Sequence, residues 1–441
     1  MEPRLQRRYQ QLVQEQAAAV SAVAAGLRAL PGEAEAFASA QAAFRFYNNE
    51  RIPLTQLSQP LLEHARNAVA DTCKSFALVV HDWSHLHFND HASKHDRIAL
   101  SQKTDRGYNL QSALLVSDRT GAPLAPVHFG LEAADGVHQS SSDVVHPHMS
   151  PLDGLAPVMA FVEQLAWQRQ AVHIIDAEAD SIGHFRHWHE GGYLFLVRAD
   201  ACNHAQYDGK SQSLEAIGEA LRPHMKFARD IEYHGKPARQ FVVETSVTIT
   251  RSAKLRRNGQ DGPRTIVPGP PLTLRLIVAE VRDDDGVVLA TWYLLTNVPQ
   301  CVIAEIIALW YYWRWRTESY YKLLKGAGQQ LEHWQQETAA ALTRRLLVTS
   351  MACVLVWQLA RSQEPEAEQV RKILTRLSGR QMKHKKPFTE PALLAGLWNF
   401  LAMMDFLERF DPHEIQRLID KILPKPAPQP YIEKPPGPPL V

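Results

Sequence analysis

The sequence is poor in cysteine and has almost no net charge, and each shortage argues against a class of protein. Its 441 residues include four scattered cysteines and no Cys-x-x-Cys pair, which argues against a disulfide framework or a cysteine-type zinc site. The formal net charge is +1, so only local clusters can indicate nucleic-acid binding. We find no apolar run of the roughly 20 residues that span a membrane, and no signal-peptide layout. We therefore expect a cytoplasmic protein without membrane contact.

Changes of pattern divide the chain into five regions. Residues 1–70 have a helical pattern and form a candidate DNA-binding region. Residues 71–200 and 299–362 combine strands with helices, which predicts two parts of one α/β core. Residues 201–298 have the pattern of a β-rich insertion between those parts. Residues 363–441 are helical with a proline-rich tail, and we expect a dimerisation surface there.

Periodicity and turn residues predict the helices and strands within these regions. Helices are expected at residues 11–30, 34–47, 60–69, 157–167, 180–189, 303–326 and 338–361. Strands are expected at residues 76–82, 98–101, 110–117, 171–176, 193–198, 241–250, 272–281 and 287–296. Pro60 suits the first position of its helix.

Two of the expected strands end on an acid. The run Phe76–Asp82 ends at Asp82, and the run Ala171–Asp176 ends at Asp176. In α/β sheets, ligands bind at the carboxyl ends of strands. An Asp in this position can equally cap a turn or the following helix, which is the commoner case for either residue alone.

The stretch 303–326 predicts one continuous helix, because no residue before Gly326 breaks it. At about 100° per residue, four polar side chains fall on one stripe of that helix. They are Tyr311, Arg314, Glu318 and Lys325. One helix would thus present an aromatic ring, two cations and a carboxylate opposite its apolar face. A solvated charge stripe on a surface helix has the same pattern.

The combination of Asp82, Asp176 and Glu318 is more informative than any one of them. Three converging carboxylates repel one another unless a cation joins them. Hard oxygen ligands select Mg²⁺ or Mn²⁺. Two such ions about 4 Å apart can activate a water or hydroxyl and stabilise the leaving oxygen of a phosphodiester. The sequence therefore predicts a site for two divalent ions.

The spacing Tyr311-x2-Arg314-x3-Glu318-x6-Lys325 resembles the Tyr-Arg-Glu-Lys signature of the insertion-sequence-four family of DDE transposases. Other segments resemble the family's in the same order, across about residues 35 to 360. They are Ala42–Phe46, Asp82, Arg106–Tyr108, Asp176–Asp180, Leu196–Arg198 and Trp292–Thr296. Ala177 stands where the family has Arg, which removes one DNA contact or salt bridge. The N-terminal part matches poorly, so recognition of the element's ends cannot be carried over.

The resemblance implies a ribonuclease-H-like catalytic core interrupted by a β-rich insertion, with helical N- and C-terminal regions. It implies that Asp82, Asp176 and Glu318 are catalytic and hold two Mg²⁺ or Mn²⁺ ions. The implied reaction is cut-and-paste transposition, by end nicking, hairpin formation and opening, and strand transfer. The implied DNA-binding residues are Tyr311, Arg314, Lys325, Trp292, Arg198 and Arg45, with Trp292 probing the space left by a flipped base.

The implied partners are double-stranded DNA, as terminal inverted repeats and as target, and a second copy of the chain in a synaptic complex. The implied location is the bacterial cytoplasm, at the nucleoid. Two other functions remain open: a DNA-binding protein that has lost catalysis, and a metal-dependent nuclease without strand transfer.

Several residues have simpler interpretations too. The pattern around Trp292 is also typical of a core tryptophan on a buried strand. Histidines around Asp82 allow a zinc site, although such spacing in a loop is usually incidental; they are His81, His85, His87, His91 and His95. Basic stretches at 251–257 and 383–386 are candidates for contact with a phosphate backbone, and solvated loops would look the same.

Overall fold

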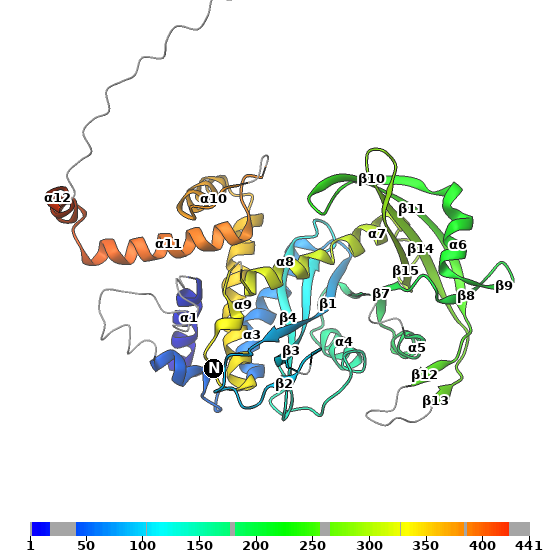
Figure 1. The fold of residues 1–441 in the computed structure, drawn as a ribbon, viewed down its shortest axis with the longest axis horizontal. Helices are drawn as coiled ribbons and strands as arrows, with labels where there is room; N and C mark the ends of the chain where they lie inside the picture. The colour runs from blue at the N-terminus through cyan, green and yellow to red at the C-terminus, as the bar shows by residue number, and fades with distance from the viewer. Residues whose placement is uncertain are drawn as a thin grey trace, which may run out of the picture.

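The computed structural model describes residues 2–17, 41–102, 104–176, 181–255, 265–326, 328–382 and 386–422. The protein has a mixed α/β fold in which one large sheet runs through the molecule (Figure 1). Helices from the two ends of the chain gather beside one end of that sheet, and strands from the middle of the chain form its other end (Figure 1). Of the two helices expected at 11–30 and 34–47, residues 18–30 and 34–40 lie outside the described residues.

The strands have the following bounds: β1 Phe76–His87, β2 Ile98–Ala99, β3 Arg106–Ser117, β4 Pro123–Ala133, β5 Gly136–Gln139, β6 Gln170–Ile175, β7 Leu194–Ala199, β8 His204–Tyr207, β9 Lys210–Ser213, β10 Lys226–Tyr233, β11 Lys236–Ile249, β12 Ala253–Leu255, β13 Thr265–Val267, β14 Leu272–Arg282 and β15 Val288–Thr296.

The helices are α1 Pro3–Ala17, α3 Leu54–Thr72, α4 Leu155–Gln164, α5 Ile182–Glu190, α6 Leu214–Leu221, α7 Ala304–Tyr312, α8 Trp315–Leu324, α9 Ala339–Arg361, α10 Pro365–Leu377, α11 Glu390–Arg409 and α12 Pro412–Ile422. Residues 41–47 are helical as well.

The strand order in the main sheet is β5-β4-β3-β1-β6-β7-β15-β14-β11-β8-β9. β6 pairs in parallel with both β1 and β7, and the other pairings along this order are antiparallel. Most strands within 201–298 extend the same sheet that contains β1 and β6, because β15 pairs with β7, β14 pairs with β15, and β11 pairs with β14. Strands β12 and β13 form a separate two-stranded sheet.

Strand β4 was missing from the sequence prediction, since its two prolines argue against a strand. In the structure, every residue of β4 except Glu132 is buried, and α3 and α9 pack against it. The pairing with β3 shifts register between Ala113 and Leu114, where Pro126 joins the ladder. An irregularity of this kind accommodates a residue that has no N–H to donate.

Helix α3 corrects another expectation. It begins at Leu54, so Pro60 lies inside the helix and not at its first position. Proline in a helix removes a backbone hydrogen bond. The helix continues through it because one face buries a series of apolar side chains, including Leu57, Leu61 and Leu62, and tertiary packing of that face outweighs the lost bond.

Helix α9 is the central helix of the molecule. Thr338 caps its N-terminus by accepting a hydrogen bond from the Ala341 N–H. Among the described residues it is the one helix long and apolar enough to cross a membrane, which corrects the expectation that no such run exists. Since 83% of its most apolar window is buried inside the protein, packing in the core also accounts for its composition.

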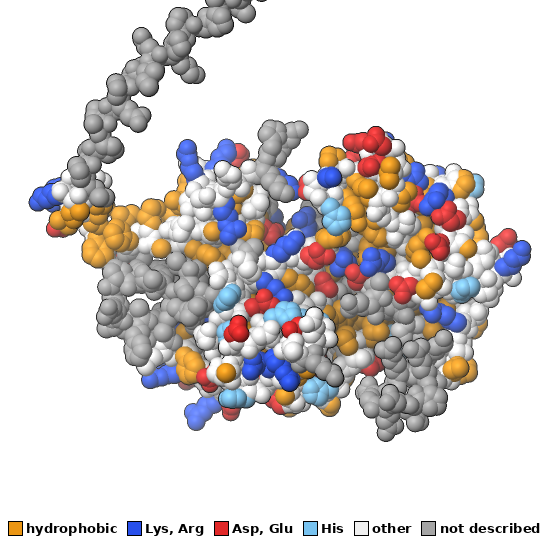
Figure 2. Space-filling model, in the orientation of Figure 1, with side chains coloured by type: hydrophobic (Ala, Val, Ile, Leu, Met, Phe, Trp, Pro, Cys, Tyr) orange, Lys and Arg blue, Asp and Glu red, His pale blue; other side chains and the backbone are white. Residues whose placement is uncertain are grey.

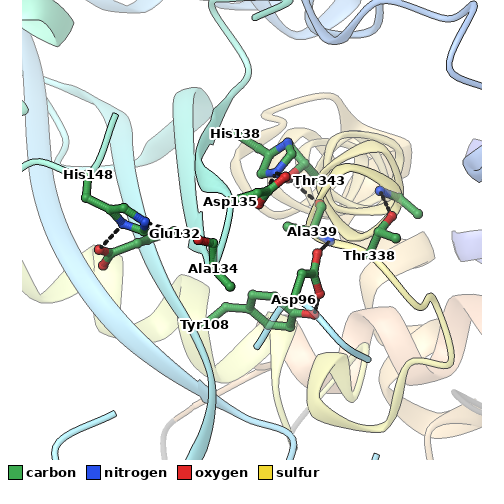
Figure 3. A network of polar contacts seen from close by, with 11 residues as sticks. Asp96, Tyr108, Glu132, Ala134, Asp135, His138, His148, Thr338, Ala339 and Thr343 are labelled. Carbon is green, nitrogen blue, oxygen red and sulfur yellow. Dashed lines mark hydrogen bonds and ion pairs between the residues drawn. The ribbon is translucent and has the colours of Figure 1, made fainter. Parts of the chain in front are cut away.

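A polar network fixes the start of α9 against the sheet (Figure 3). Asp96 accepts hydrogen bonds from the Tyr108 hydroxyl and, at 2.7 Å, from the backbone N–H of Ala339. Nearby, Nε2 of His138 on β5 lies 3.1 Å from a carboxylate oxygen of Asp135, in the turn between β4 and β5. A carboxylate at a helix N-terminus satisfies a free N–H and complements the helix dipole.

Candidate active site

Strand register places Asp82 beside Asp176. The parallel pairing of β1 with β6 reaches Val80 opposite Ile174, and β6 ends one residue later, at Ile175. Asp82 and Asp176 are each two residues beyond that pair, so both side chains leave the same face of the sheet. Asp82 does not end its strand as predicted, because β1 continues to His87 in pairing with β3.

The helix expected at 303–326 is divided in two. Helix α7 ends at Tyr312 and α8 begins at Trp315. Across the junction, the N–H of Arg314 bonds to the Tyr311 carbonyl and the N–H of Thr317 to the Arg314 carbonyl. These three-residue steps are those of a tighter turn than an α-helix, and such a turn within a helix often marks a hinge.

Packing at the junction explains the break. Trp313 lies against Gly121, where a side-chain carbon would meet the indole ring at 2.4 Å. Arg316 Nε donates to the carbonyl of the same glycine at 2.9 Å. Trp310 packs edge-on against Phe76, with ring centroids 5.4 Å apart. Trp310 and Trp313 are thus held by different neighbours.

Three carboxylates converge on the guanidinium of Arg314. Its Nη1 lies 3.7 Å from Asp82 Oδ2, and its Nη2 lies 3.2 Å from Asp176 Oδ2 and 3.6 Å from Glu318 Oε1. The Arg314 side chain is only 9% exposed. The structure therefore brings together β1, the end of β6 and α8, which are far apart in the sequence, around one buried cation.

Further groups position the two aspartates. Arg198 Nε lies 2.8 Å from Asp176 Oδ1, and the Tyr311 hydroxyl donates to that oxygen at 2.9 Å. Asp82 Oδ1 accepts from the Trp83 N–H at 2.9 Å. The Tyr321 hydroxyl donates to the Asp82 carbonyl at 3.0 Å. Tyr321 was missed by sequence reasoning, which singled out Tyr311 alone among the tyrosines of this stretch as a site residue.

Burial affects the pKa of three groups at this site, Asp82, Tyr311 and Arg314. It raises the pKa of Asp82 to about 6, against the opposing effects of Arg314 and the Trp83 N–H, while Asp176 and Glu318 raise it further. Burial also raises the pKa of Tyr311, as does the adjacent Asp176, so its hydroxyl is a hydrogen-bond donor at neutral pH. Burial opposes the charge of Arg314, but the surrounding Tyr311 and carboxylates together raise its pKa.

Lys325 lies outside this group, although the predicted stripe included it. The helix ends at Leu324, and the Lys325 backbone leaves the helical region. Its Nζ donates to the His85 carbonyl at 2.6 Å and lies 3.3 Å from Glu332 Oε1.

Trp292 and Arg45 also lie apart from the carboxylates. Trp292 is buried and packs edge-on against Tyr311 at 5.2 Å, as a core tryptophan would. Arg45 is exposed on the helix 41–47, whose end is held by Arg344 of α9 through the Tyr47 carbonyl at 3.2 Å. Arg198 is half-buried beside Asp176. Their roles in DNA binding stay predictions.

The histidines around Asp82 are divided among separate contacts. His81 is buried and lies 2.9 Å from His173, whereas His85 contacts Asn109 at 2.6 Å and His91 contacts Lys94 at 3.2 Å. Across the described ranges, no three side chains of His, Cys, Asp or Glu lie close enough together to hold one metal ion as they stand. The zinc alternative therefore finds no support here, and the three carboxylates surround a guanidinium instead.

Residues 177–180 after Asp176, residues 256–257 of the first basic stretch and residues 383–385 of the second lie outside the described residues. At the end of the second stretch, Lys386 Nζ lies 2.9 Å from Glu232 Oε1.

Comparison with known proteins adds little. No protein-family model matches the chain, and no curated protein matches it. Among solved structures it is similar to one described as a piggyBac transposase synaptic complex with hairpin DNA, at 11% sequence identity and a TM-score of 0.32. The match covers 81% of this chain, and the chain spans 59% of the length of that protein. A TM-score this low carries no argument about function.

Proposed function

We propose that the protein is a DNA transposase of the insertion-sequence-four type, which cuts and joins DNA with Asp82, Asp176 and Glu318. The observation that supports this most is the convergence of these three carboxylates on one side chain, within 3.2–3.7 Å of the guanidinium nitrogens of Arg314. Isolated acids that only cap turns or helices have no reason to meet. The proposal includes a ribonuclease-H-like core, and it is supported by the position of Asp82 and Asp176 on neighbouring parallel strands.

The chemistry of the three donors fits Mg²⁺ or Mn²⁺. All are carboxylates, which hard divalent cations prefer, and no thiol or imidazole contacts them in the described contacts. The guanidinium of Arg314 among these acids supports a cluster that is stabilised by a cation. When bound, two such ions would supply activation of the attacking hydroxyl and stabilisation of the leaving oxygen.

The chain's own residues position this site. Arg198 and Tyr311 hold one oxygen of Asp176, so its other oxygen is the one that faces Arg314. The Trp83 N–H likewise holds Asp82 Oδ1, so Asp82 Oδ2 is the oxygen that faces Arg314. Phosphoryl transfer depends mainly on positioning and charge, and these hydrogen bonds fix the carboxylates before DNA arrives.

The DNA is the transposon end and then the target, bound by two copies of the chain in the bacterial cytoplasm. Arg198 is placed to reach a phosphate, because its half-buried side chain already lies beside Asp176. Tyr311, Arg314, Lys325 and Trp292 keep the DNA-binding roles implied by the resemblance.

The test is cleavage of the element's own ends. Purified protein is incubated with DNA carrying the inverted repeats that bracket its gene, with Mg²⁺, with Mn²⁺ or with a chelator. We expect nicks, hairpins and joined products on denaturing gels only with metal. Asp82→Ala, Asp176→Ala and Glu318→Ala should each abolish all products. Glu63→Ala changes an exposed acid on α3 and should leave them unchanged.

The products also separate the other candidate functions. Metal-dependent cleavage without hairpins or joined molecules would identify a nuclease. Specific DNA binding with no metal-dependent cleavage would identify a protein that has lost catalysis. Uncut repeats and identical behaviour of Asp82→Ala would refute the proposed transposase.

A further inference from the structure

The contacts of Arg314 differ from those of a structural salt bridge. Strong pairs of arginine with carboxylates have N···O distances of about 2.7–2.9 Å and are often bidentate. Arg198 reaches Asp176 at 2.8 Å, but Arg314 lies 3.2–3.7 Å from its three acids and shares one nitrogen between Asp176 and Glu318. The guanidinium is central to the cluster but is not closely bound to any one member.

The Nε atom of Arg314 supports the same conclusion. It is buried and has no hydrogen-bond partner. Buried polar groups in proteins are normally paired, and an unpaired one calls for an explanation. A side chain that is held only by the summed charge of three carboxylates, with a donor left unsatisfied, is in a position that it can leave.

The charges indicate what would displace it. Among the described residues, the three carboxylates contact two guanidinium groups, those of Arg314 and Arg198, so negative charge exceeds positive charge in these contacts. A divalent ion among the same oxygens would lie within a few ångströms of the Arg314 charge, and like charges at that distance repel strongly in a buried site. The ion and the guanidinium therefore compete for the same carboxylates.

The backbone at Arg314 allows such a movement. The residue lies at the tight turn between α7 and α8, before the regular hydrogen bonding of α8 begins. The rings of Tyr311 and Trp315 lie 5.9 and 5.7 Å from its guanidinium carbon. Trp315 is partly exposed, so its ring offers the cation a surface on the way to solvent.

We infer that Arg314 is an exchangeable internal counter-ion, which occupies the carboxylate cluster in the metal-free protein and leaves when divalent ions bind. The inference rests on the proposed function, since it assumes that these acids are the metal site. The released guanidinium, whose planar geometry suits phosphate, then becomes available to the DNA backbone. By thermodynamic linkage, metal binding and binding of a phosphate by Arg314 would each strengthen the other.

The experiment measures Mn²⁺ binding without DNA, by electron paramagnetic resonance, in the full chain and two variants. Arg314→Met removes the competing charge but keeps an extended side chain, and we expect it to bind Mn²⁺ about tenfold more tightly or better. Arg314→Lys keeps a positive charge and should bind as weakly as the natural protein. Equal or weaker binding by Arg314→Met would overturn the inference, because Arg314 would then be supporting the metal site.

A second measurement needs no variant, in case Arg314→Met does not fold. Phenylglyoxal modifies accessible arginines, and peptide mass spectrometry locates the modified positions. Mn²⁺ should increase the modification of Arg314 several-fold and leave Arg345, which is buried in α9, unmodified. Protection of Arg314 by Mn²⁺, or no change, would contradict the exchange.

The two proposals fail in distinguishable ways. Mn²⁺ binding that Asp82→Ala abolishes, with no cleavage of DNA, would refute the transposase and leave the exchange standing. If the protein cleaves DNA but its Mn²⁺ affinity is the same with and without Arg314, only the exchange would be refuted. Absence of Mn²⁺ binding in the natural protein and in both variants would refute the inference together with the metal site.

Discussion

At the scale of single residues, the position of Asp176 depends on Tyr311. The two are joined by a 2.9 Å hydrogen bond, and the tyrosine ring is buried. Tyr311→Phe keeps the ring and should lower the free energy of unfolding by only about 1 kcal/mol. Because Asp176 loses a positioning contact, we expect single-turnover nicking to slow about tenfold. In the matched control Tyr312→Phe, the lost bond is to the Glu232 carbonyl at 2.7 Å, and nicking should be unchanged. Equal slowing in both variants would contradict the role of Tyr311.

Buried histidines make the fold sensitive to acid. Burial lowers the pKa of His128 from 6.5 to about 3, and His146 lowers it further. Between these two pH values the unfolded chain binds a proton that the folded protein does not. The contribution to stability is therefore complete above pH 6.5 and is lost as the pH falls, at about 1.4 kcal/mol per pH unit. His173, whose pKa burial lowers to about 3, adds to the effect in the same direction.

Urea unfolding at pH 7.5, 6 and 5 tests this sign. His128→Gln retains a hydrogen-bond partner for Ser141, which lies 3.2 Å from the His128 ring, and should reduce the pH dependence by about one proton. His148→Gln is the control, because His148 is exposed and its hydrogen bond to Glu132 raises its pKa. His148→Gln should lose at least as much stability in acid as the natural protein does. An unchanged slope in His128→Gln would show that folding does not lower the pKa of His128.

At the scale of elements, the junction between α7 and α8 depends on Gly121. Its φ is +65°, and an added side-chain carbon would lie 2.4 Å from the Trp313 ring. Gly121→Ala should lower the free energy of unfolding by about 1–3 kcal/mol and displace the turn that carries Arg314. Gly209→Ala is the matched control, with φ +71° and no atom within 4 Å. Both variants introduce backbone strain, but only Gly121→Ala introduces the clash. The difference between their free energies of unfolding in urea therefore measures the clash. Similar losses in both would indicate strain alone.

The same junction shows what sequence could and could not predict. The strand that carries Asp82, the strand before Asp176 and the helical stretch that carries Glu318 follow from apolar runs and spacing, which are local signals. The break before Trp315 does not, because it depends on Gly121, nearly 200 residues away in the sequence. Helical spacing also placed Arg314 near Glu318 but could not show that it reaches both aspartates, which depends on strand register.

The end of α8 and strand β4 were misjudged for related reasons. Sequence spacing placed Lys325 on the helical stripe, but the helix ends one residue earlier, at Leu324. The Lys325 side chain instead contacts the His85 carbonyl and Glu332. Strand β4 was missed because Pro126 is unfavourable in a regular ladder, whereas its pairing with β3 is irregular there. In both cases a tertiary contact outweighs the local preference.

At the scale of the whole molecule, the C-terminal helices leave an apolar surface uncovered. The first half of α11 packs in the core through Ala392, Leu393 and Leu394, and α11 lies against α10. Farther along the same helix and in α12, large apolar side chains are exposed, and they form an orange area on the projecting arm (Figure 2). They are Met403, Met404, Phe406, Leu407, Phe410, Leu418, Ile419 and Ile422. An uncovered apolar area of this kind is typical of a protein–protein interface.

This surface is where we expect the second copy of the proposed synaptic complex, since cutting two transposon ends requires two sites held together. The double variant Phe406→Asp and Leu407→Asp adds charge to the exposed half of α11 and should leave the core unaffected. By mass photometry, the natural chain with end DNA should give complexes of two proteins and two DNA ends, and the variant should give one of each. Glu414→Gln, an exposed polar change on α12, should preserve the larger complex.

The same double variant should keep first-strand nicking, because Asp82, Asp176 and Glu318 lie on other elements, whereas joining of two ends to a target should fail. Paired complexes in the double variant would place the dimer interface elsewhere on the molecule.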